Sequence, residues 1–366
     1  MSFFSDLFKS KKQETVRTRQ DMENSLTVIE GEERHTTTSR GVLNRIFKYE
    51  RPSREEERKT LRKVFDLMSS VPQGKKLLDD VAKAGYEIFF EAFKSDSFGC
   101  MYGNKKKIVL STAKHENVAG MAMSLLHEMT HAVQNERSEM FSDKRAQYVL
   151  ADQFKFWRAS EAAACAEEAK FAYQIKDRHP EIEKFAEKFP MYPAFKAEME
   201  KSGDMAKAGE AAFKAWYGFK EYQESYEEDH VHIFSYSLKS DGVGNRAKLT
   251  KSFPSAEVLQ KVFISDDIGK NISADYLTSK EAFSVSEEAV QKLDKLLDSL
   301  GKKGKDMSMH SMYSVGTEKT YSEVLSQSAE NAAASHCPKS SGKTSTQTDK
   351  VKQAAFIQAR GRMTQR

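Results

Sequence analysis

Two histidines and a glutamate form the most specific chemical pattern in the chain, His127-Glu128-x-x-His131. Residues i and i+4 of an α-helix lie one turn apart on one face, so both imidazoles can point at the same place. Imidazole is largely unprotonated at neutral pH and is then a good zinc ligand. Glu128 is placed to reach a water on the metal as a general base. The pattern therefore predicts a zinc site that activates water.

The residues around this motif predict a helix that packs on the core and ends near Asn135. Histidine is scarce, with 9 in 366 residues, and an unpaired imidazole in such an apolar stretch would be costly to desolvate. The alternative is an ordinary amphipathic helix with two histidines near its polar edge, and we favour the metal site. The apolar stripe consists of Val118, Met121, Ala122, Leu125, Met129 and Val133.

A catalytic zinc usually takes three protein ligands and leaves one position to water. One known extension of the motif has a glycine and then a histidine after the second histidine, but Gln134 and Arg137 occupy those positions and exclude it. We predict that Glu161 is the third ligand, on a later helix whose small residues permit close approach. One face of that helix is expected to hold Phe154, Trp157, Glu161, Cys165 and Glu168.

A carboxylate among such neighbours would be buried and would need a cation or hydrogen bonds. Zinc meets that need for Glu161, with Arg158 one turn back as a supporting group. The alternative is a plain ion pair between these two residues. Other candidates for the third ligand are Asp152, Glu167, Glu168 or a distant histidine.

The segments Leu125–Gln134 and Arg158–Ala164 resemble the gluzincin branch of zinc metallopeptidases and are similar to uncharacterised bacterial metallopeptidase domains. The resemblance covers residues 60–235. It implies one Zn²⁺ per chain on His127, His131 and Glu161, with Glu128 as the base. Such families often add a tyrosine or histidine that stabilises an oxyanion. The candidates here are Tyr226, His230 and His232, although we expect all three at a solvated acidic helix end.

The remaining pattern predicts an α+β fold that is mostly helical. We expect a zincin-like core, with a small sheet before the motif helix and a long second helix that bears the third ligand. Strands are expected over 86–93, 98–102 and 105–110, with a two-residue hairpin at Gly103-Asn104. Helices are expected over 53–71, 75–83, 142–176, 204–226, 255–263 and 284–300, with a loop at Pro190 and Pro193.

Composition divides the chain into four predicted parts. Residues 1–52 are expected to be disordered, 53–240 to form the zincin-like metallopeptidase domain, 241–300 to be a helical extension, and 301–366 to be a basic, low-complexity, disordered tail. The net charge is +4, yet seven basic residues and one acid give residues 338–366 a charge of +6, so the rest carries −2. The basic charge is therefore a property of the tail, and we expect no nucleic-acid partner.

Location is predicted from cysteine usage and from the lack of long apolar runs. Cys100, Cys165 and Cys337 are far apart and odd in number, which indicates a reducing compartment. No run approaches the about 18 apolar residues of a membrane span, and no signal peptide is recognisable. We expect a cytoplasmic protein, with export as an effector by a non-Sec route left open.

The function predicted from these residues is a zinc-dependent peptidase that acts on a peptide or protein. The main alternative is a catalytically inactive zinc-binding or helical scaffold protein that binds a protein partner, and the presence of Glu128 favours the enzyme. A basic-tailed adaptor or nucleic-acid-associated protein, suggested by residues 338–366, is a second alternative. Cleavage specificity and oligomeric state have no signal in the sequence.

Overall fold

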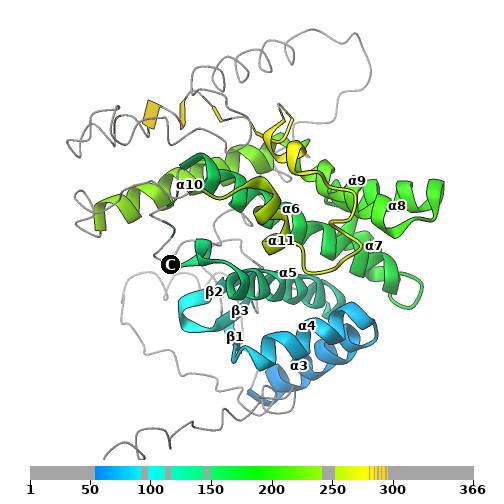
Figure 1. Cartoon of the computed structure of the whole chain (residues 1–366). Helices are drawn as coiled ribbons and strands as arrows, with labels where there is room; N and C mark the ends of the chain where they lie inside the picture. The colour runs from blue at the N-terminus through cyan, green and yellow to red at the C-terminus, as the bar shows by residue number, and fades with distance from the viewer. Residues whose placement is uncertain are drawn as a thin grey trace, which may run out of the picture.

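The computed structural model describes residues 54–91, 98–111, 117–142, 150–240 and 252–279, with some of the residues in 145–148 and 281–295 (Figure 1). The predicted disordered segments 1–52 and 301–366 lie outside these residues, as do Cys337 and most of the helix expected over 284–300. The predicted domain boundaries therefore stay predictions.

Two helices come first, α3 (Arg54–Ser69) and α4 (Pro72–Lys83). Three glutamates in the first turn of α3 stabilise the N-terminal end of the helix, where the helix dipole is positive. The second helix begins at Pro72 rather than at the expected residue 75, because the first turn of a helix needs no N–H from that position. Both helices bury an apolar face in the main core.

Three strands follow, β1 (Glu87–Glu91), β2 (Gly99–Tyr102) and β3 (Lys107–Ser111), in the spatial order β1-β3-β2. The central strand β3 runs parallel to β1 and antiparallel to β2. The predicted two-residue hairpin is wrong: a 3₁₀ turn over Gly103–Lys105 and then Lys106, with a left-handed φ of 49°, connect β2 to β3. This longer connection lies against the side chain of Asn135 at the end of the motif helix.

The motif helix α5 (Val118–Arg137) is the centre of the fold. Asn117 caps it by accepting a hydrogen bond from the Gly120 N–H at 2.7 Å. The helix packs on α3, α4, β2 and β3 and on the long helix α6 (Leu150–Ile175) (Figure 1). Residues 119–134 are all buried, which explains why the helix is apolar on more than one face.

Helix α6 is long, as predicted, but it begins at Leu150 rather than at 142. Next come α7 (Pro180–Ala186), α8 (Met191–Ser202), α9 (Met205–Tyr217) and α10 (Lys220–Ser240). The single helix expected over 204–226 is wrong, because the chain turns at Gly218 and separates α9 from α10. The loop expected at Pro190 and Pro193 is the start of α8.

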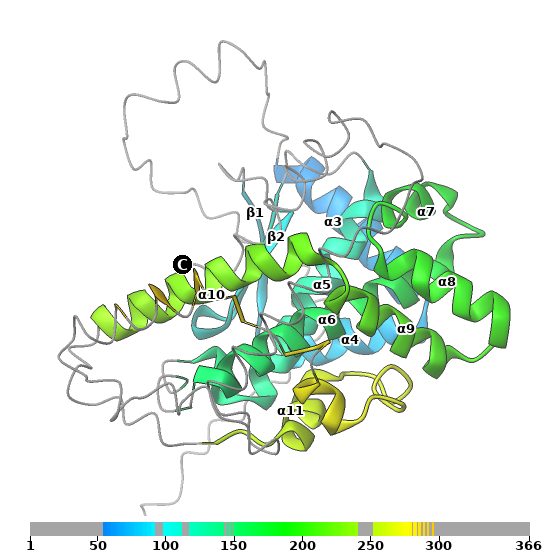
Figure 2. The same cartoon turned by 90° about the horizontal axis from the view of Figure 1, so that it is seen from above.

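Helices α8 and α9 pack on α6, and α10 runs across α6 (Figure 2). The last described helix is α11 (Ser255–Val262), which packs on α5 and α6 and is followed by a 3₁₀ turn over Ala274–Thr278. The expectation of a mostly helical α+β fold with a small sheet before the motif helix is confirmed. No helix in the described ranges is long and apolar enough to cross a membrane.

Candidate metal centre

Helices α5 and α6 bring together the three residues predicted as metal ligands, His127, His131 and Glu161. The Nε2 atom of His127 lies 3.4 Å from Glu161 Oε2, and the Nε2 atom of His131 lies 3.3 Å from Glu161 Oε1. The two Nε2 atoms are 2.9 Å apart. All three side chains therefore direct one ligand atom at a common point.

The donor set fits a zinc ion. Ligand atoms about 2.0–2.2 Å from a tetrahedral zinc are about 3.3–3.6 Å apart, which matches both histidine–glutamate distances. The distance between the two imidazoles is shorter and is also that of an N–H···N hydrogen bond. Two imidazoles and one carboxylate are a usual set for a catalytic zinc with one open position. All three residues are at most 5% exposed, so their polar atoms need partners within the protein.

The two histidines favour the ionised form of Glu161, and acidic neighbours favour the protonated form of His127. Burial by itself would raise the pKa of the Glu161 carboxyl, but His131 and His127 hold that pKa well below its usual value. Burial opposes protonation of His127, while the nearby Glu168 carboxylate and further contacts to Cys165 and Glu161 raise its pKa well above 6.5. The centre therefore favours a carboxylate beside positive charge, which is the environment a bound cation provides.

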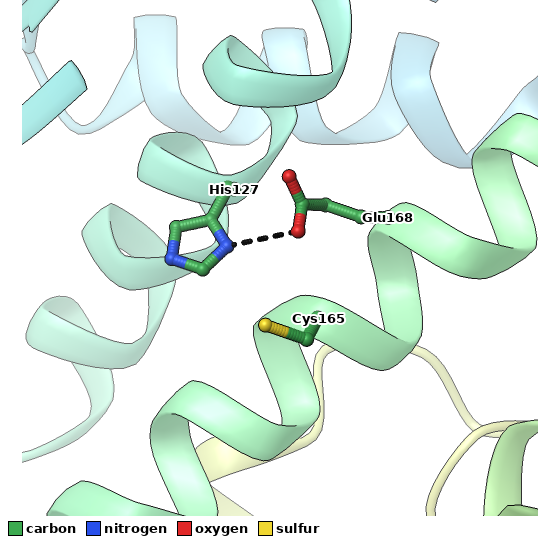
Figure 3. Close-up of side chains that lie close together, drawn as sticks. All are labelled: His127, Cys165 and Glu168. Atoms are coloured by element: carbon green, nitrogen blue, oxygen red, sulfur yellow. Dashed lines mark ion pairs between the residues drawn. The ribbon is translucent and has the colours of Figure 1, made fainter. Parts of the chain in front are cut away.

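The other ring nitrogen of His127 faces a second pair of side chains from α6, Cys165 and Glu168 (Figure 3). Glu168 Oε2 lies 3.3 Å from His127 Nδ1. These three residues could themselves hold an ion. A neutral imidazole offers only one lone pair, however, so the ring serves one set at a time. Glu168, an alternative third ligand in the sequence, thus lies on the side of His127 opposite to Glu161.

The second histidine has a neutral partner. His131 Nδ1 lies 2.8 Å from Gln134 Oε1, and Gln134 Nε2 donates to the carbonyls of Ser160 (3.2 Å) and Val262 (2.8 Å). Sequence reasoning used Gln134 only to exclude one variant of the motif. Its spacing of three residues from His131 on one helix could have indicated the contact.

Helix α10 supplies a further partner for Glu161. The Tyr226 hydroxyl donates to Glu161 Oε2 at 2.9 Å. The expectation that Tyr226, His230 and His232 lie at a solvated helix end is wrong for the first two, which are buried, whereas His232 is exposed. Residues 226 and 230 share the face of α10 that packs inward.

His230 is enclosed by aromatic rings, and burial lowers its pKa to about 3. It is therefore neutral at physiological pH. Neither of its ring nitrogens has a hydrogen-bond partner among the residues the structure describes. The neighbouring rings, with centroids at 5.5–6.4 Å, are those of Phe154, Trp157, Tyr226 and Phe234.

The remaining acidic candidates have other contacts. Arg158 was expected to support Glu161 but forms its ion pair with Glu227 of α10 at 3.3 Å. Glu167 accepts hydrogen bonds from Gln73 and Ser265. Asp152 accepts from Lys155 and from the Phe253 N–H, both at 2.7 Å.

Glu128, the predicted base, points toward the sheet. It is 2% exposed. A Cβ atom placed on Gly99 of β2 would lie 2.9 Å from Glu128 Cγ and 3.3 Å from Oε1. Successive residues on a helix are about 100° apart, so Glu128 faces β2 while His127 faces α6. The carboxylate is thereby held between the motif helix and an edge strand.

The sequence model of one protein family, described as "Putative metallopeptidase family (DUF6782)", matches residues 42–263. That span runs from before α3 to the end of α11 and includes every residue of the centre described above. No curated protein matches the chain, and no solved structure matches it.

Proposed function

The chain belongs to this metallopeptidase family, and on that premise we propose that it is a zinc-dependent peptidase with a gluzincin-type site in a zincin-like core. The observation that carries the proposal is the convergence of two imidazoles and a carboxylate from two helices, with Glu128 one residue after the first ligand. A purely structural zinc site would normally have four protein ligands and no need of that glutamate.

In this proposal His127, His131 and Glu161 hold one Zn²⁺. Zinc bound there supplies a Lewis acid that lowers the pKa of a coordinated water toward neutrality and polarises the carbonyl under attack. Glu128 takes the proton of the attacking water and delivers it to the leaving amine. The hydroxyl of Tyr226 orients Glu161 through the 2.9 Å hydrogen bond.

The proposed substrate is an extended segment of a peptide or protein. Strand β2 is at one edge of the three-stranded sheet, and its first residue, Gly99, lies against Glu128. A peptide that pairs with such an edge would run past the carboxylate that activates water. We further propose a cytoplasmic site of action, because three widely spaced cysteines, an odd number, indicate a reducing compartment.

The test separates metal binding from hydrolysis. Glu128→Gln should keep the fold and one zinc per chain but lower the hydrolysis of a dye-labelled unfolded protein by about 10²–10⁴-fold. His131→Ala should lose the zinc, measured by metal analysis after gel filtration. The matched control is Glu136→Gln, at a half-exposed position near the end of the same helix, which should retain activity.

Full activity of Glu128→Gln would contradict the mechanism, and one zinc per chain in His131→Ala would remove this centre from consideration. The inactive-scaffold alternative predicts a third result. Wild-type protein would then bind zinc at this centre but hydrolyse nothing, and Glu128→Gln would leave every measured property unchanged.

A further inference from the structure

One side chain connects a proposed ligand to two other helices. Gln134 of α5 contacts His131 Nδ1 through its oxygen and donates through its nitrogen to the carbonyls of Ser160 in α6 and Val262 in α11. We propose that Gln134 is the positioning residue of His131 and that the backbones of α6 and α11 fix its orientation. This inference rests on the proposed function, because it concerns the same metal centre.

The hydrogen bonds determine which way the amide points. Gln134 is 0% exposed, so water cannot replace a missing partner. In the observed orientation, the two N–H groups of the amide each donate to a carbonyl oxygen. A flipped amide would instead place its own oxygen against these two carbonyl oxygens. Its oxygen must therefore face His131. The imidazole then carries a proton on Nδ1, which leaves Nε2, the nitrogen nearer to Glu161, as the one that would bind a metal.

The contact with α11 has a physical cause of its own. The last four carbonyls of a helix have no partner within the helix. Val262 is the final residue of α11 and Phe263 is its C-cap. Gln134 donates to the Val262 carbonyl, and Arg137, one turn later on α5, donates to the Phe263 carbonyl. The end of α11 is thus capped by side chains of the motif helix.

The capping strengthens the contact to the histidine. The C-terminal end of a helix carries partial negative charge. An amide that donates to it becomes polarised, and its oxygen is then a better acceptor, as in other hydrogen-bonded chains. The Nδ1–H of His131 is held more firmly, which makes Nε2 a better ligand. Losing such a partner typically costs about 10–100-fold in metal affinity.

Two substitutions of Gln134 separate positioning from structural support. Gln134→Met keeps the volume and removes every hydrogen bond, so the zinc affinity should fall by about 10–100-fold. Gln134→Glu keeps an acceptor for Nδ1–H but sets a carboxylate against two carbonyls. It should lower the unfolding temperature of the metal-free protein while its zinc dissociation constant stays within about threefold of wild type. Affinities are measured on the full chain by competition with a chelator.

Arg137→Met is the matched control. It removes the neighbouring contact to α11 without touching His131, so its zinc affinity should stay within about threefold of wild type. Wild-type affinity in Gln134→Met would overturn the inference, as would equal losses of affinity in the Met and Glu variants. Different results would contradict the proposed function itself. In that case the wild-type protein would bind no zinc, or His131→Ala would bind zinc as well as the wild-type protein does.

The tautomer of His131 gives a test that needs no variant at position 134. Nitrogen chemical shifts of the metal-free protein should show the proton of His131 on Nδ1. His131→Ala identifies the signals. A ring without a proton on Nδ1 would overturn the inference even if Gln134→Met failed to fold.

Discussion

Gly99 limits where the carboxylate of Glu128 can lie. A Cβ at this position would be 2.9 Å from Glu128 Cγ, closer than real Cβ contacts. Gly99 is not among the described glycines with a positive φ, so a substitution there would be opposed only by contacts of the new Cβ, which include the Val109 carbonyl oxygen at 3.2 Å. A side chain at position 99 would therefore act on the proposed base, Glu128, without contacting a proposed metal ligand.

Gly99→Ala should displace Glu128 and lower kcat/KM by about 10–100-fold while the zinc dissociation constant stays at the wild-type value. Gly218→Ala is the control, since its Cβ would meet only the Ala215 carbonyl at an ordinary 3.6 Å. Parallel measurement of zinc affinity and peptide hydrolysis checks the prediction. Loss of zinc in Gly99→Ala would show that this strand supports the ligands rather than the base.

Tyr226 is the residue of α10 that touches a proposed ligand. Tyr226→Phe removes one hydrogen bond to a buried carboxylate, and the zinc affinity should fall by about 10-fold. Tyr222→Phe, one turn earlier on the same helix and also buried, should leave it unchanged. Chelator competition measures both, and equal affinities for the two variants would contradict a ligand-orienting role for Tyr226.

At the scale of elements, α6 and α10 are joined by a buried ion pair. Arg158 is 1% exposed, and burial lowers its pKa, an effect opposed by the charge of Glu227. Glu227 also accepts from the Ser286 N–H at 3.0 Å. The pair therefore connects α6 and α10 to a segment near the end of the described chain.

Glu227→Gln leaves a buried guanidinium without its counter-charge, so the free energy of unfolding should fall by about 3–5 kcal/mol. Glu228→Gln, next to it but exposed, should change it by less than about 0.5 kcal/mol. Urea unfolding measures both. The double substitution Arg158→Met with Glu227→Leu should recover much of the loss, because no uncompensated charge remains.

The sequence predicts those parts of the site that depend on local pattern. The spacing of the two histidines and the small residues around Glu161 are local, and both helices form where they were expected. The burial of Tyr226 was not predictable from the acidic run that follows it. Arg158, which is 69 residues from Glu227 in the chain, pairs with this first residue of the run, and such distant pairing has no local signal.

The wrong predictions of one helix and one turn have similar physical causes. Aromatic residues continue across Gly218 with helical spacing, so periodicity alone does not separate α9 from α10. The β2–β3 connection depends on its contact with Asn135, which belongs to a later helix. Expected element types were therefore more accurate than expected boundaries.

At the scale of the whole molecule, the segment 252–279 contacts the helices that carry the centre. Lys170 of α6 pairs with Asp267 at 2.7 Å, and Glu167 accepts a hydrogen bond from Ser265. Burial is the main reason that the pKa of Glu167 rises to about 7, with Lys170 opposing the rise. This carboxyl is therefore titratable near neutral pH where the segment meets α6.

Folding should consequently become less favourable as pH rises. The pKa of Glu167 is higher in the folded protein than its usual value of 4.5, so the unfolded chain loses this proton first. The contribution to stability is complete below about pH 4.5 and is lost by about pH 7, a change of about 3 kcal/mol. Glu167→Gln should remove this part of the pH dependence. Unfolding of both proteins between pH 5 and 8 measures it, and parallel curves would contradict it.

The hydrogen bond from Gln134 to Val262 spans 128 residues of sequence, and this separation has a consequence during synthesis. At about 5–20 residues per second, the histidines leave the ribosome roughly 6–25 s before the carbonyl that completes their surroundings. During that interval Gln134 lacks one of the two carbonyls that fix its orientation toward His131. We therefore expect a chain that stops before α11 to bind zinc more weakly than the full chain.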